Sequence, residues 1–161
     1  MARQQSDRED LLREATALVE RAELKVAGFD EPIIVGFRRG GAASFFFGSD
    51  PVYQFSAAGE LRRAFVAGCL VKAEQGRLVR LSRERSAAAV TLVRDELDAR
   101  EQAELLAAAE AKLRRLAAAL AAGDFKLIGQ VPADSDIVER VRQWFDARPG
   151  EISVALVPNV R

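Results

Sequence analysis

The feature that most constrains the fold is a succession of short β-rich segments between residues 31 and 94, separated by a few turn-forming residues each. Connections this short join neighbouring strands only in the antiparallel direction, because a parallel crossover is much longer. The segments read PIIVGFRR, ASFFFG, PVYQFS, ELRRAFV, CLVKAE, RLVRLSRER and AVTLVR. The sequence therefore predicts an antiparallel β-meander of about six or seven strands over residues 31–94.

Helical patterns flank the predicted meander. In the first, Ser6 and Glu9 form a capping box before apolar residues at helical spacing, which predicts a helix near residues 6–22. Residues 22–27 also alternate enough to form a short strand instead. The polar residues 1–5 are expected to be unstructured.

After the meander, Asp98 and Gly123 bracket a run of strong helix formers and predict a helix over residues 98–122. A clean amphipathic pattern predicts another helix over residues 136–147.

Segments with strand character at residues 125–131 and 151–157 stand on either side of that last helix. They predict a β-α-β end, in which the last strand joins the sheet edge or pairs with residues 125–131. At 161 residues, the chain fits one domain. We therefore expect a single α+β domain over residues 1–161, with the meander packed against flanking helices and residues 95–161 mainly helical.

Three consecutive phenylalanines, Phe45 to Phe47, raise the question of what covers the sheet, because successive side chains on a strand point to opposite faces. If Gly40 and Gly41 form the whole preceding loop, Phe46 shares a face with Val35. If the loop is one residue longer, Phe45 and Phe47 take that face. Either the two faces are covered by the two later helices, one helix to a face, or one aromatic face is open to a partner.

The chain has no histidine and a single cysteine, Cys69. Ser-His-Asp and Cys-His catalysis are therefore excluded, and the commonest transition-metal ligand is missing. A lone cysteine provides no disulfide framework and favours a reducing compartment, which we take to be the cytoplasm. Ser49 and Asp50 belong to a turn, and nothing in the sequence requires Asp50 and Glu60 to pair. We expect no cofactor, no metal site and no catalytic activity.

Charge is balanced over the whole chain but not along it. Residues 33–94 hold ten basic and four acidic side chains, whereas the complete sequence holds 24 of each sign. This asymmetry indicates either an acidic partner or pairing of the basic middle with its own acidic flanks. The wealth of alanine and arginine is typical of a GC-rich, bacterial genome. No segment has the run of about 18 apolar residues that a membrane span requires.

Basic and aromatic side chains in the meander are the candidate binding residues. A basic sheet with exposed rings binds single-stranded nucleic acid in several small folds, since arginines contact phosphates and bases stack on rings. The same rings could line a small-molecule pocket under the long helix. The candidates are Arg38, Arg62, Arg63, Arg80, Phe46, Tyr53 and Phe65.

Leu106, Leu113 and Leu120 recur every seven residues and predict either a homodimer seam or the face of a helix packed on its own sheet. The segment YQFSAAGELRRAF, Tyr53 to Phe65, resembles a unit of the YD-repeat shells, with Ser56 in place of their aspartate. That resemblance implies a strand, a glycine turn and a new strand, and no function.

These observations favour a soluble, non-catalytic protein that binds another protein or a second copy of itself. The alternative is a single-stranded nucleic-acid-binding module that uses the basic, aromatic meander.

Overall fold

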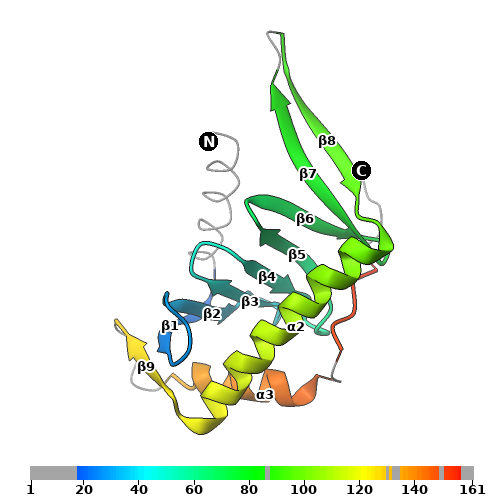
Figure 1. Cartoon of the computed structure of the whole chain (residues 1–161). Coiled ribbons are helices and arrows are strands. Elements are labelled where there is room, and N and C mark those ends of the chain that lie inside the picture. Colours follow the sequence, from blue (N-terminus) through cyan, green and yellow to red (C-terminus); the bar gives the residue numbers. More distant parts are fainter. Residues whose placement is uncertain (1–17, 86–87, 130, 132–134, 149–150, 157–161) are drawn as a thin grey trace.

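The computed structural model describes residues 18–85, 88–129, 131, 135–148 and 151–156, and these form one antiparallel sheet with two helices (Figure 1). The strands are β1 (Glu20–Val26), β2 (Ile33–Phe37), β3 (Ala43–Phe47), β4 (Val52–Phe55), β5 (Leu61–Val66), β6 (Cys69–Glu74), β7 (Arg77–Arg85), β8 (Val90–Glu96) and β9 (Phe125–Ile128). The helices are α2 (Ala99–Ala122) and α3 (Ile137–Ala147).

The nine strands lie in the order β8-β7-β6-β5-β4-β3-β2-β1-β9. Strands β2 to β8 are consecutive neighbours, so the predicted seven-segment meander is confirmed. The sheet is wider than predicted because β1 continues it on one side and β9 then pairs antiparallel with β1.

The predicted helix near residues 6–22 is wrong over its last residues, because β1 begins at Glu20. In β1, Ala22, Leu24 and Val26 are buried while the residues between them are exposed, which is the strand alternation noted in the sequence. The predictions for residues 1–5 and for a helix over residues 6–17 lie outside the described residues.

The hairpin between β2 and β3 takes the longer of the two predicted loops. The Arg38 N–H donates to the Ala42 carbonyl at 2.8 Å, which leaves a three-residue loop whose Gly40 and Gly41 have φ of 97° and 96°. Val35 therefore lies opposite Phe45. Phe45 and Phe47 point to one face of the sheet, and Phe46 points to the other.

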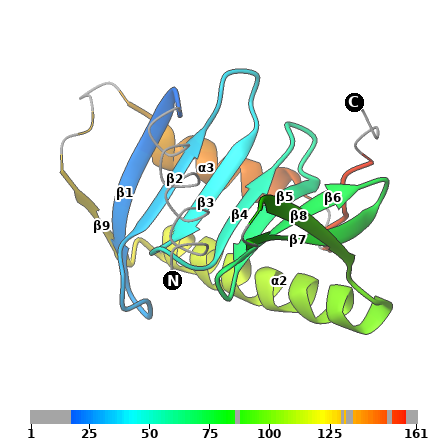
Figure 2. The same cartoon turned by 90° about the horizontal axis from the view of Figure 1, so that it is seen from above.

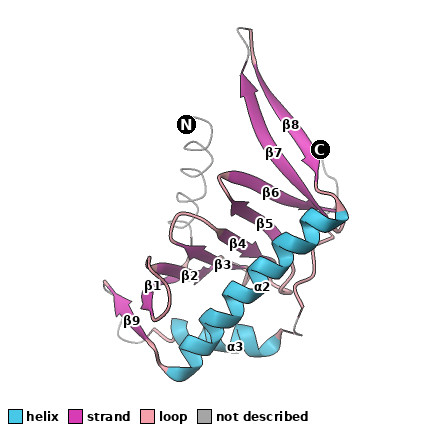
Figure 3. Cartoon of the chain, viewed as in Figure 1, coloured by secondary structure: helices cyan, strands magenta, loops and turns pink. Residues whose placement is uncertain are grey.

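Both helices pack on the same face, which we call the helix face (Figures 2 and 3). The ring of Phe45 lies 5.0 Å from that of Trp144 and 5.5 Å from that of Phe145 in α3, while Leu113 and Leu120 of α2 are fully buried in the same core. The prediction of one helix to each face is therefore wrong. A sheet that bends around two adjacent helices buries both of their apolar stripes at once.

The opposite face, which we call the outer face, carries a smaller apolar cluster. Phe46, Val52 and Phe65 pack there with Leu18, and all four are buried. The chain at the start of β1 passes close to Gly36. A Cβ atom added to Gly36 would lie 2.4 Å from the Glu20 carbonyl oxygen, so only glycine fits there. Phe46 is thus not an open aromatic surface.

The two predicted C-terminal helices are confirmed to within a residue. Asp98 and Glu101 form a reciprocal capping box at the start of α2, and Gly123 ends the helix with φ of 77°. Neither described helix is long and apolar enough to cross a membrane.

The predicted β-α-β end is not confirmed. β9 and α3 are present, but in the described residues 151–156 only Val154 forms a bridge, and its parallel partner is Leu61 at the start of β5. The Leu61 N–H donates to the Ser153 carbonyl at 2.8 Å, and the Ala155 N–H donates to the Leu61 carbonyl at 2.9 Å. This segment therefore lies beside the middle of the sheet and not at its edge or against β9.

Candidate functional site

A row of polar side chains crosses the outer face. Ser44 is the direct cross-strand partner of Gln54, Gln54 is the partner of Arg63, and Arg63 is the partner of Lys72. Directly opposite residues in an antiparallel sheet share a face and lie side by side. Four consecutive strands, β3 to β6, thus bring together residues that are far apart in the sequence.

The neighbouring row on the same face is apolar. Phe46 lies opposite Val52, Val52 opposite Phe65, and Phe65 opposite Leu70. The outer face therefore has a buried apolar stripe beside a basic and polar stripe.

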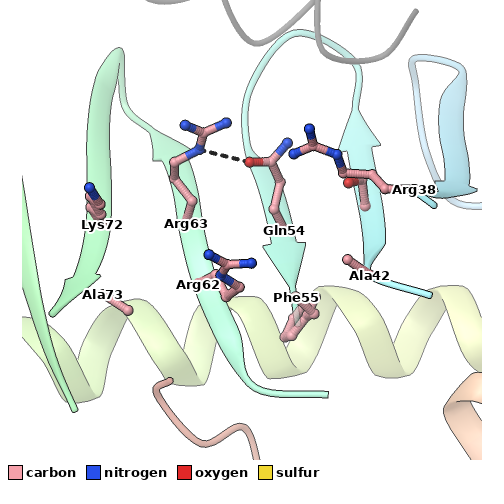
Figure 4. Close-up of a pocket in the computed structure, with 9 residues that line it drawn as sticks. Arg38, Ala42, Gln54, Phe55, Arg62, Arg63, Lys72 and Ala73 are labelled. Carbon is pink, nitrogen blue, oxygen red and sulfur yellow. Dashed lines mark hydrogen bonds between the residues drawn. The ribbon is translucent and has the colours of Figure 1, made fainter. Parts of the chain in front are cut away.

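A β-bulge concentrates positive charge in the polar row. The register of β4 and β5 pairs Gln54 with Arg63 but Phe55 with Leu61, so Arg62 is an extra residue in β5. A bulge redirects side chains that strict alternation would send to opposite faces. Both Arg62 and Arg63 consequently line the same groove (Figure 4).

This basic groove has a volume of about 230 Å³. Four of its side chains are cationic, namely Arg38, Arg62, Arg63 and Lys72, and none of the lining residues is acidic. Arg63 Nε donates to Gln54 Oε1 at 2.8 Å, which orders that side chain on the groove wall. The full lining is Arg38, Ala42, Ser44, Gln54, Phe55, Arg62, Arg63, Lys72 and Ala73.

Ser44 adds an unusual feature to the groove. Its side chain is 1% exposed, and its Oγ atom has no hydrogen-bond partner in the described part of the chain. A buried hydroxyl is normally satisfied, because an unpaired one costs free energy. An unpaired hydroxyl next to guanidinium groups can donate to an anionic oxygen.

Arg62 and Lys72 are both exposed. Among the residues that the structure describes, no carboxylate forms an ion pair with either of them. Two positive charges of the groove are therefore available to a ligand.

Arg80 does not belong to this groove. Its guanidinium lies on the helix face, 3.5 Å from an Asp95 carboxylate oxygen and 3.6 Å from one of Glu101. Arg77 likewise pairs with Glu96. Pairing of the basic middle with its own acidic flank is thus confirmed at this end of the sheet, whereas the groove lies over β3 to β6 in the middle.

The three candidate rings are buried on different faces. Phe46 and Phe65 are 0% exposed on the outer face, whereas Tyr53 is 2% exposed on the helix face. They do not line one pocket, and none offers an open surface on which a base could stack.

The leucine series lies on the face of α2 that packs on its own sheet, which is the second of the two interpretations of its spacing. Leu113 and Leu120 are buried in the core of their own chain, and Leu106 is half-buried against it. They contact the sheet through α2, as a helix does when it covers its own sheet.

Asp50 of the meander has a structural role. Both carboxylate oxygens of Asp50 accept hydrogen bonds from the turn between β5 and β6, from Ala67 N–H at 3.0 Å and Gly68 N–H at 2.8 Å. Burial, together with the nearby Asp50 charge, raises the pKa of Tyr53 to about 12.

The described residues contain no group of three or more histidine, cysteine, aspartate or glutamate side chains that could hold a metal ion.

Sequence reasoning identified Arg38, Arg62 and Arg63 but missed Ser44 and Gln54. The alternation of side chains along a strand places Ser44 on the same face as Phe46, and Gln54 on the same face as Val52, because each pair is two residues apart. This placement could be read only once the register was known.

The comparisons with known proteins supply no further assignment. No protein-family model matches the chain, and no curated protein or solved structure is significantly similar to it.

Proposed function

We propose that this is a non-catalytic binding protein whose basic groove takes an acidic segment of another protein. The observation that carries this proposal is the groove itself, in which four cations and an unpaired buried hydroxyl converge and no lining residue is acidic. Carboxylates accept charge-assisted hydrogen bonds from guanidinium groups in a planar, often bidentate geometry, which arginine provides better than lysine. We infer that binding takes place in a reducing cytoplasm, as the single cysteine suggests.

A protein segment fits the groove better than single-stranded nucleic acid does. Modules that bind single strands combine phosphate contacts with base stacking, and the candidate rings here are buried. The chain is also neutral overall, whereas nucleic-acid-binding domains are usually basic. Binding of an oligonucleotide through its phosphates alone, without base stacking, is one outcome that the test below distinguishes.

The test is fluorescence anisotropy of a labelled acidic peptide of about ten residues with the full chain, beside a glutamine peptide of equal length. We expect the acidic peptide alone to bind, with an affinity that falls as salt rises. The double variant Arg62→Glu/Lys72→Glu should weaken binding by at least about tenfold, which corresponds to 1.4 kcal/mol.

The matched control is Lys25→Glu/Lys126→Glu, which changes the net charge equally at the far edge of the sheet, where these lysines are cross-strand partners. The proposal fails if the two double variants behave alike. It also fails if an oligonucleotide binds more tightly than the acidic peptide and competes for the same groove.

An occupant from within the chain is a distinguishable alternative. Residues 1–17 carry Asp7, Glu9, Asp10 and Glu14, which lie outside the described residues. If these carboxylates occupy the groove, replacing them by their amides should raise the affinity for the acidic peptide. If the groove takes a separate protein, the affinity should stay the same.

A further inference from the structure

Strand β8 forms one edge of the sheet, and within the described residues no strand lies on its far side. Together with β7 it forms a hairpin that projects beyond the body of the molecule (Figure 1). An exposed edge presents backbone N–H and C=O groups to any strand that can approach it.

The direction of these groups follows from one hydrogen bond. The Leu97 N–H donates to the Leu78 carbonyl at 3.0 Å, so the backbone groups of Leu97 point toward β7. The backbone groups of consecutive residues in a strand point in alternate directions. Thr91 is six residues from Leu97, an even number, so its backbone groups also point toward β7. The N–H and C=O groups of Val90 and Leu92 therefore point away from the sheet.

The side chains at the same positions are apolar and open. Val90 and Leu92 are each 56% exposed, although both are large hydrophobic residues. The run from Val90 to Val93 has no charge, no proline and no glycine, and β-branched residues make up most of it. Edge strands are usually protected by a charged residue or a proline, and this part of β8 has neither.

The other free edge differs in this respect. Strand β9 carries Lys126 at its centre, with an exposed side chain. A lysine on an edge strand opposes pairing with another strand. Pairing is therefore expected at β8 and not at β9.

We propose that β8 pairs antiparallel with β8 of a second copy, about a twofold axis through Thr91. This register places Val90 opposite Leu92 of the partner copy, and Leu92 opposite the partner's Val90. Both residues direct their backbone groups outward, so the two pairs form four N–H···O=C hydrogen bonds. The four exposed apolar side chains of the two copies then lie together on the outer face.

Neighbouring registers are less favourable. An axis through Leu92 would place Val90 opposite Arg94 of the partner, and an axis through Val93 would place Leu92 opposite that arginine. Of these three registers, only the axis at Thr91 places both Val90 and Leu92 opposite an apolar residue. The dimer would join two sheets edge to edge, and it is independent of the basic groove.

The test begins with light scattering on the full chain over a series of concentrations. We expect a mass that rises from 17.6 kDa toward twice that value. Leu92→Pro should keep the chain monomeric while leaving it folded, because the amide that it removes points outward and proline is tolerated in that position. Leu127→Pro on β9 is the matched control, because the Leu127 amide also points away from the sheet, and this variant should still dimerise.

Cross-linking provides the second measurement. In the proposed register the two Thr91 residues form a non-hydrogen-bonded pair with a Cα separation of about 4.5 Å, which suits a disulfide. In a Cys69→Ala background, Thr91→Cys should form a covalent dimer under oxidation, whereas Leu127→Cys should not. A chain that stays monomeric and does not cross-link would overturn the proposal. So would a dimer that survives Leu92→Pro and does not cross-link through residue 91.

Discussion

The Nε atom of Arg63 donates a 2.8 Å hydrogen bond to Oε1 of Gln54, its direct cross-strand partner on the outer face. This bond restricts the arginine before any ligand arrives, which lowers the entropic cost of binding. We expect Gln54→Met to weaken binding of the acidic peptide several-fold, in line with about 1 kcal/mol for a lost hydrogen bond.

The salt dependence should stay the same, because the substitution alters no charge. Anisotropy titrations at two salt concentrations measure both quantities. An unchanged affinity would show that this hydrogen bond does not prepare the groove.

Ser44 should behave as a functional residue and not as a structural one. Because its buried Oγ has no partner among the described residues, Ser44→Ala should leave the free energy of unfolding unchanged or raise it by about 1 kcal/mol. The same variant should bind the acidic peptide more weakly. Ser56→Ala is a contrasting control, since Ser56 Oγ accepts from the Glu60 N–H at 3.2 Å and its loss should destabilise the fold. Urea denaturation distinguishes the two, and equal destabilisation would remove the reason to assign Ser44 to the groove.

Tyr53 should make stability decline at alkaline pH. Its pKa is about 12 in the folded chain and about 10 when exposed, so the folded state retains a proton that the unfolded state loses. The stabilisation is complete below pH 10 and is lost as pH rises from about 10 to about 12. Because Tyr53 is the single tyrosine, absorbance at the tyrosinate band reports its pKa directly. In Tyr53→Phe this decline should be smaller, and a titration midpoint near 10 in the native chain would contradict the expectation.

The leucines of α2 should be needed for folding and not for association. Leu113 is 1% exposed, so Leu113→Glu buries a charge in the core and should lower the free energy of unfolding by at least about 3 kcal/mol. Leu106→Glu, at a half-buried position, should cost clearly less. Urea midpoints and light scattering on the same samples provide the measurement. If Leu113→Glu stays folded and only the mass changes, the leucine series is an interface.

Local patterns were sufficient for α2, α3 and the strands β2 to β8. Asp98 and Gly123 mark the ends of α2 because capping involves neighbouring residues only, and short turns determine that β2 to β8 are antiparallel neighbours. The strand character of residues 22–27 was also visible, although the capping pattern at Ser6 favoured a longer helix.

Long-range relationships were beyond those patterns. The amphipathic stripe of α3 predicts that Trp144 packs against the sheet, but not on which side, because either face would cover it equally well. Val154 pairs with Leu61 across most of the chain, and a short apolar run does not specify its partner.

The sequence by itself determined the strands β2 to β8 and their antiparallel order, the helices α2 and α3, and the absence of histidine chemistry. Only the tertiary structure decided that α2 and α3 share one face and that Ser44, Gln54, Arg63 and Lys72 form one row. The physical reason is register. A shift of one residue at the Gly40–Gly41 loop, or the extra residue at Arg62, exchanges the faces of a strand at little local cost. The packing of the whole sheet selects among these registers.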